Sequence, residues 1–333
     1  MKHVVIGRKV DRMKRRAIVL CMAAFATGTA NGQASRHWRI GVLRPGPKDA
    51  VFQQNFDPFV SALRGLMSAR DISMEYRVRP AGSEEMLAMA NELVQAKVDA
   101  IVAIATGGVT AAAKATRELP IVAIDLETDP VGQKFAASLA RPGGNITGVF
   151  LDFPELSGKW IQLLKEAMPA LERVAVLSDA ASGPYLLQGA LAAGAAMRMQ
   201  MQQLEARGPA QFAAAFEAAA KQKSQALLVL SSPVFNSARK SIADLALKHQ
   251  LPTVMPFPQF ADDGGLMAYG PHLTDLFRQA AGIMAKILKG ESPGRIAIER
   301  PIKFEFVINL TTAGALGLRI PHSLMVRADR VVE

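Results

Sequence analysis

The sequence predicts an α/β fold of two doubly wound parallel-sheet lobes joined by a hinge, and three observations predict it. Short runs of β-branched residues alternate with helix-length stretches rich in Ala and Leu, a pattern typical of βαβ units. This alternation fills the first half of the chain and occurs again in the second half. Near the midpoint, Arg141-Pro142-Gly143-Gly144-Asn145 precedes β-branched residues, which favours the end of a helix, a sharp turn and a strand. We expect the chain to leave its first lobe there.

The first half contains four expected strands separated by helices. The strands are 38–43, 73–78, 99–105 and 120–125, and the helices are about 49–69, 83–97 and 108–118.

The second half repeats the pattern with clearer helices. Phe212, Phe216 and Ala219 share one helix face, and apolar residues recur at helical spacing from Leu273 to Leu288. We interpret these Met and Phe stripes as core. The stretch 302–309 lies beyond the last of these helices, and we expect it to return to the hinge or to the first lobe. The expected strands are 173–179, 199–205, 225–232, 251–257 and 265–270, and the expected domains are lobe 1 at 35–148, lobe 2 at 149–290 and a return segment at 291–333.

Residues 1–34 have the pattern of a signal peptide. A basic region precedes the apolar run "AIVLCMAAFA", and Gly32 and Ala34 stand at the −3 and −1 positions of a cleavage site. The apolar run is shorter than the ~20 residues that span a bilayer. We expect export to the periplasm with cleavage after Ala34. Twin-arginine export through Arg15-Arg16 and lipid attachment at Cys21 remain alternatives.

Removal of this segment changes the electrostatics. It carries seven Lys or Arg and one Asp, so the net charge falls from +10 to +4, and no basic run remains to indicate nucleic-acid binding. Cys21 is the only cysteine, so the mature chain forms no disulfide and has no thiolate chemistry.

Enzyme signatures are absent from the sequence. It contains neither a phosphate-binding GxxxxGK[ST] loop, nor a GxSxG elbow, nor an HExxH zinc motif, and its histidines lack metal-ligand spacing. We expect no cofactor and no catalytic residue. The run Asp125, Glu127, Asp129 alternates, so in an extended segment its carboxylates would point the same way. They can bind a ligand amine or a cation, or form a solvated strand end.

Several blocks resemble the substrate-binding proteins of ABC importers, in the group that includes tryptophan- and phenylalanine-binding members. The resemblance runs from about residue 39 to the C-terminus. It implies a type I periplasmic-binding fold, with a ligand held between two lobes and delivered to a permease and its ATPase. The blocks are "RIGVLRPGP" (39–47), "DPVGQKFAASLARPGGNITGV" (129–149), "ELSGKWIQLLKEAMPALERVAVL" (155–177), "GGLMAYGPHLTDLFRQAAGIMAKILKGESP" (264–293) and "KFEFVINLTTAGALGL" (303–318).

Two departures from this family bear on the ligand. Many relatives carry Trp-Asn-Pro where this chain has Ser178-Asp179-Ala180, and many carry Glu where Gln259 stands. Both positions lie at strand ends of lobe 2. The resemblance therefore implies a role and a fold, but not an aromatic amino acid as the ligand.

Ligands of open parallel sheets bind beyond the carboxyl ends of the strands, where helix N-termini offer free N–H groups. Thr106 to Gly108 precede an expected helix and suit a carboxylate, while Asp125 or Asp129 can pair with an amine. Ser231 and Ser232 can donate hydroxyl hydrogen bonds. The candidates are Arg44, Thr106, Gly107, Gly108, Asp125, Asp129, Ser178, Asp179, Ser231, Ser232, Phe257, Gln259 and Tyr269.

This set favours a zwitterion, so we expect an amino acid or a derivative rather than a sugar. Arg44 and Ser178 can equally serve a plain carboxylate. A periplasmic sensor subunit for a membrane receptor is the main alternative function, and an enzyme in the cleft is the second. We expect the two lobes to close on the ligand as rigid bodies.

Overall fold

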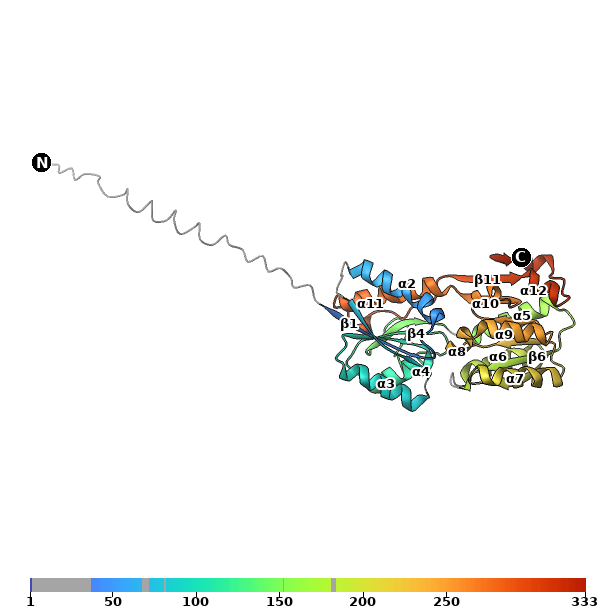
Figure 1. The fold of residues 1–333 in the computed structure, drawn as a ribbon. Helices are drawn as coiled ribbons and strands as arrows, with labels where there is room; N and C mark the ends of the chain where they lie inside the picture. The colour runs from blue at the N-terminus through green and yellow to red at the C-terminus, as the bar shows by residue number, and fades with distance from the viewer. Residues whose placement is uncertain (2–36, 68–71, 81, 152, 181–183) are drawn as a thin grey trace. The chain divides into compact units, whose positions relative to one another are not determined.

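Five parallel strands form the first sheet, in the order β2-β1-β3-β4-β5 (Figure 1). The computed structural model describes Met1 and residues 37–333, apart from 68–71, 81, 152 and 181–183. The strand bounds are β1 (Trp38–Pro45), β2 (Ile72–Arg79), β3 (Ala100–Ile104), β4 (Ile121–Asp125) and β5 (Ile146–Phe150).

Helices cover both faces of this sheet because the strand order reverses. The chain passes from β1 to β2 at one edge and returns to β3 on the other side of β1, so right-handed crossovers place successive helices on opposite faces. Ile40 and Val42 of β1 join the core that contains Phe52 of α2, whereas Leu43 joins the core that contains Met89 of α3. The helices are α2 (Ala50–Met67) and α11 (Leu273–Leu288), which contact each other, and α3 (Ser83–Gln95) and α4 (Ala105–Ala115), which do the same.

Seven strands form the second sheet, in the order β12-β11-β10-β9-β8-β6-β7. All neighbouring pairs are parallel except β10 with β11. The strand bounds are β6 (Arg173–Ser178), β7 (Gln200–Glu205), β8 (Ala226–Val229), β9 (Thr253–Met255), β10 (Met267–Pro271), β11 (Phe304–Asn309) and β12 (Arg330–Val332). The helices of this lobe are α5 (Phe153–Ala167), α6 (Tyr185–Ala196), α7 (Pro209–Lys221), α8 (Pro233–Ser237), α9 (Arg239–Lys248), α10 (Gln259–Asp262), α12 (Leu310–Ala315) and α13 (His322–Met325).

The predicted α/β fold with two doubly wound lobes is confirmed, but the C-terminal third crosses between the lobes more often than expected. Helix α11 follows β10 of the second sheet, yet it packs on α2, β4 and β5 of the first lobe. Residues 293–299 then run beside β5, where Glu299 N–H donates to the Gly148 carbonyl. Strands β11 and β12 return to the second sheet. The expected placement of α11 in lobe 2 and of 302–309 at the hinge or first lobe is therefore wrong, and of the return segment 291–333 only the part around 293–299 lies beside lobe 1. Apolar periodicity predicts a buried face but not the sheet that buries it.

The midpoint segment also differs from the prediction. No helix precedes Pro142, since residues 126–145 form turns and bends. Asp129 closes the first of these turns by accepting the N–H groups of Val131 and Gly132. Strand β5 then pairs with β4, so residues 141–145 precede the last strand of lobe 1, which ends at Phe150 rather than at the predicted residue 148.

Residues 2–34 of the expected signal peptide lie outside the described residues. Within the described part of the chain, no helix is both long and apolar enough to cross a membrane.

Candidate binding pocket

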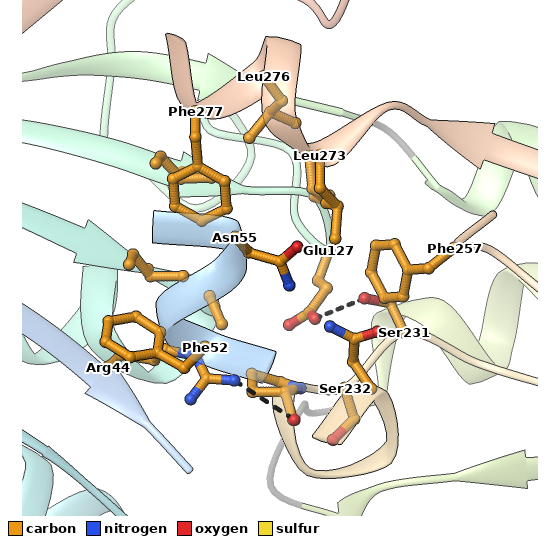
Figure 2. A pocket seen from close by; sticks show the side chains of 16 residues that line it. Arg44, Phe52, Asn55, Glu127, Ser231, Ser232, Phe257, Leu273, Leu276 and Phe277 are labelled. Carbon is orange, nitrogen blue, oxygen red and sulfur yellow. Dashed lines mark hydrogen bonds between the residues drawn. The ribbon is translucent and has the colours of Figure 1, made fainter. Parts of the chain in front are cut away.

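A pocket of about 70 Å³ lies between the two lobes, at the carboxyl ends of their strands (Figure 2). The reversal of strand order explains its position, because the connections that follow β1 and β3 run in opposite directions along the first sheet, and those that follow β6 and β8 do so along the second. Most of the lining comes from lobe 1 and α11. These residues are Arg44, Phe52, Asn55, Ile104, Ala105, Ile124, Leu126, Glu127, Leu273, Leu276 and Phe277, and those from lobe 2 are Ser231, Ser232, Pro233, Asn236 and Phe257.

Arg44 is the cation of this pocket. It is the penultimate residue of β1 and is 5% exposed, and its guanidinium lies 5.0 Å from the centre of the Phe52 ring. One guanidinium nitrogen donates to the Pro47 carbonyl at 2.9 Å, and the other lies 3.4 Å from the Pro233 carbonyl of lobe 2. Burial lowers the pKa of Arg44 to about 10, so the group remains charged at neutral pH. Among the described residues, three of its five N–H groups have no hydrogen-bond acceptor.

Glu127 is the acidic group of the pocket, and it is 4% exposed. Its Oε1 accepts a hydrogen bond from the Ser231 hydroxyl of lobe 2 at 2.9 Å, and its Oε2 lies 3.2 Å from Thr106 Oγ1. Figure 2 shows its carboxyl group directed into the same space as the Asn55 amide. Glu127 thus joins the two lobes at the pocket.

Asp125 lies behind Glu127 and is fully buried at the end of β4. Its oxygens accept the Glu127 N–H at 2.9 Å and the Thr128 hydroxyl at 2.6 Å, and the Thr106 hydroxyl lies at 3.2 Å. Burial raises the pKa of Asp125, although these hydrogen bonds oppose it. Burial, and next the charge of Asp125, raises the pKa of Glu127.

Two of the predicted serines of lobe 2 donate hydrogen bonds to carboxylates of the protein itself. Ser231 donates to Glu127, whereas Ser232 donates to Asp179 at 2.6 Å and caps the N-terminus of α8. Ser178 donates to the carbonyl of Leu204 on the neighbouring strand and does not line the pocket.

The expected anion loop is the first turn of a helix. Helix α4 begins at Ala105, whose φ of +61° lies in the left-handed region, three residues before its predicted start. Thr106 therefore faces two carboxyl groups rather than an anion site. A Cβ on Gly108 would lie 2.9 Å from the Leu43 carbonyl, so this glycine allows α4 to approach β1, and neither it nor Gly107 lines the pocket.

Three further predicted residues lie outside the pocket lining. Asp129 closes its turn, Gln259 begins α10, and the ring of Tyr269 stacks on Phe304 with centroids 6.0 Å apart.

The apolar wall was largely missed by the sequence analysis. Phe52 and Phe277 flank the pocket in Figure 2, with Phe257 across from them. Leu273 and Leu276 reach it because α11 packs on lobe 1. Asn236 of α8 also lines the pocket, and its buried Oδ1 has no hydrogen-bond partner among the described residues. No pattern in the sequence marks these residues as anything but core. Among the described residues, no group of three or more Asp, Glu or His side chains is placed to hold a metal ion.

Comparisons with known proteins agree on one family. The model of a family described as ABC transporter substrate binding protein matches residues 57–332. A tyrosine-binding protein of Clostridioides difficile (strain R20291) is 24% identical over 265 residues, which cover 78% of this chain and 76% of that protein.

Solved structures show the same fold. A conserved domain protein from Vibrio cholerae superposes with a TM-score of 0.80 at 23% identity, covering 89% of this chain and all of its own. An ABC domain from Streptococcus pneumoniae in complex with L-Trp superposes with a TM-score of 0.79 at 20% identity and the same coverage. The fold is that of type I periplasmic binding proteins.

Proposed function

We propose an α-amino acid with an apolar side chain as the ligand of this chain, which belongs to the ABC transporter substrate-binding protein family. A single observation carries the proposal: one buried guanidinium and one buried carboxyl group line the same otherwise largely apolar pocket. Arg44 would bind the ligand carboxylate, and Glu127 would bind its ammonium group. Phe52, Phe257 and Phe277 would surround the side chain.

The relatives support this class of ligand. Of the three proteins described above, one is named for tyrosine and another was solved with L-Trp. The present pocket, at about 70 Å³, is smaller than the ~150 Å³ cavity that holds a benzene molecule. Its two lobes must therefore move apart to admit such a ligand, which supports the hinge motion expected from the sequence.

The family is a substrate-binding family and not an enzyme family. We therefore propose that the protein binds and releases its ligand without turnover. An ABC permease and its ATPase would receive the ligand at the inner membrane. The protein would act in the periplasm after cleavage behind Ala34.

Matched ligands test the zwitterion directly. L-leucine, isopentylamine and 4-methylpentanoate share one side chain but carry both charged groups, the ammonium alone or the carboxylate alone. We expect isothermal titration calorimetry to show that L-leucine or L-phenylalanine binds at least tenfold more tightly than the matching amine, which lacks the carboxylate, and the matching acid, which lacks the ammonium. If the deaminated acid bound as tightly as the amino acid, the ammonium would have no part in recognition. If only sugars stabilised the protein against unfolding, the proposed ligand class would be refuted.

A further inference from the structure

The hydrogen bonds of Thr106 constrain the protons at this site. Its Oγ1 lies 3.2 Å from Asp125 Oδ1 and 3.2 Å from Glu127 Oε2. A hydroxyl group has one hydrogen to donate, so it serves only one of these two acceptors well. The other contact becomes a full hydrogen bond when a carboxyl group carries a proton and donates it to Thr106.

The remaining donors assign this proton to Glu127. Both oxygens of Asp125 already accept hydrogen bonds, from the Glu127 N–H and from the Thr128 hydroxyl. These bonds stabilise Asp125 as an ion. Glu127 Oε1 accepts from Ser231, whereas among the described residues Oε2 has only Thr106 within hydrogen-bond distance. The consistent arrangement is a chain in which protonated Glu127 donates to Thr106 and Thr106 donates to ionised Asp125.

The charged groups around Glu127 favour the same assignment. Asp125 approaches from β4, and Asp179, which follows β6, raises the pKa of Glu127 by its like charge. Arg44 approaches from β1, but in the described part of the chain its guanidinium donates to two carbonyl oxygens and not to Glu127. Two nearby carboxylates and burial therefore favour the protonated form of Glu127, and the one nearby cation, which is hydrogen-bonded to carbonyl oxygens, does little to favour the ionised form.

We propose that Glu127 exchanges its proton for the ammonium group of the ligand, an inference that rests on the proposed function. The ammonium keeps its three hydrogens and donates a hydrogen bond through one of them to the carboxylate of Glu127. The O–H bond of Glu127 breaks, and its proton leaves to solvent. Binding of one amino acid then releases about one proton.

This exchange has a defined pH dependence. Below the pKa of Glu127 in the free protein, each binding event must remove a proton, so the affinity for an amino acid rises with pH, by up to tenfold per pH unit. Above that pKa the affinity becomes constant, until the ligand ammonium itself loses its proton. A ligand without an ammonium group gains nothing from the exchange.

Calorimetry in buffers of different ionisation enthalpy measures the released protons. With L-leucine or L-phenylalanine as the probe at pH 6 to 7, we expect about one proton per bound ligand for the native protein. The Glu127→Gln variant, which cannot release a proton, should show none and should bind with an affinity independent of pH in this range. Glu217→Gln, the same substitution at an exposed position of α7, should behave as the native protein. Binding by the native protein without proton release would overturn the exchange and leave the proposed function standing.

A second measurement needs no ligand. The infrared difference spectrum between the native protein and Glu127→Gln at pH 6 should contain the C=O stretch of a protonated carboxylic acid. Its absence would overturn the proposal whatever the ligand. If this band is present but no amino acid binds, the proposed function fails and the exchange fails with it.

Discussion

Replacement of Arg44 by Met should separate recognition of the ligand carboxylate from recognition of the rest of the ligand. Met preserves an unbranched apolar stem of similar length but has no N–H groups. The guanidinium stands alone as the cation among the described pocket residues, and it has three N–H groups free of the Pro47 and Pro233 carbonyls. The substitution therefore removes the positive charge at the proposed carboxylate subsite.

The expected magnitude follows from the burial of this group. A hydrogen bond to a charged partner contributes about 1.5–3 kcal/mol, and Arg44 is 5% exposed, so solvent and salt screen it little. Since about 1.4 kcal/mol corresponds to a tenfold change, the affinity for an amino acid should fall about 10- to 150-fold. Binding of the corresponding amine should change less than threefold, since it makes no carboxylate contact.

Calorimetric titration of Arg44→Met with the matched amino acid and amine provides the assay. Arg173→Met is the matched control, because Arg173 lies at the start of β6 and outside the binding pocket. Thermal denaturation should show that both variants remain folded. An amino-acid affinity within threefold of the native value, or equal losses for the amino acid and the amine, would refute the assignment of Arg44 to the carboxylate.

Three further predictions concern the scaffold. Gly148→Ala should lower the free energy of unfolding by more than about 3 kcal/mol, because the φ of Gly148 is +149° and a Cβ would collide with the Ala123 backbone. Gly144→Ala is the control, since a Cβ there has open space and should lower the free energy of unfolding far less. Urea denaturation compares the two variants. Trp160→Phe should lower the free energy of unfolding by about 1–3 kcal/mol, because it removes the 2.7 Å hydrogen bond from Nε1 of this buried indole to the Tyr269 carbonyl of β10, and an unchanged melting temperature would contradict this. Because the pKa of Glu127 is raised in the folded state, its contribution to the free energy of unfolding is fully present below the ordinary Glu pKa near 4.3. That contribution is lost as the pH rises through the raised pKa. Glu127→Gln should therefore lessen the fall in melting temperature between pH 5 and 9.

Much of the fold could be predicted because its signals are local. A buried parallel strand is a short β-branched run, and the strand ends that converge at a switch point follow from the order of the sheet. Arg44, Ser231 and Phe257 were found in this way and do line the pocket. The partner of a helix is not a local property, so α11 and its contribution to the pocket could not be assigned from periodicity.

The acidic run shows why the rest failed. Alternation places Asp125, Glu127 and Asp129 on one side only if the chain stays extended. Instead, the Asp125 carboxylate accepts the Glu127 N–H, and the chain turns directly after β4. Glu127 then faces the pocket, while Asp129 closes the next turn. The rule that alternate residues point to the same side does not apply here, because a hydrogen bond between the Asp125 side chain and the backbone turns the chain out of the extended conformation.

The two lobes contribute unequally to the pocket, and this inequality suggests how binding proceeds. Both charged groups assigned to the ligand, Arg44 and Glu127, belong to lobe 1, which also holds α11 and most of the apolar wall. Lobe 2 adds the Ser231 hydroxyl, the Pro233 carbonyl and the ring of Phe257, and the first two of these already bond to the charged groups of lobe 1. On the proposed function, lobe 1 therefore holds both charged groups that would bind the amino acid, and we expect lobe 2 to close over them when a ligand binds.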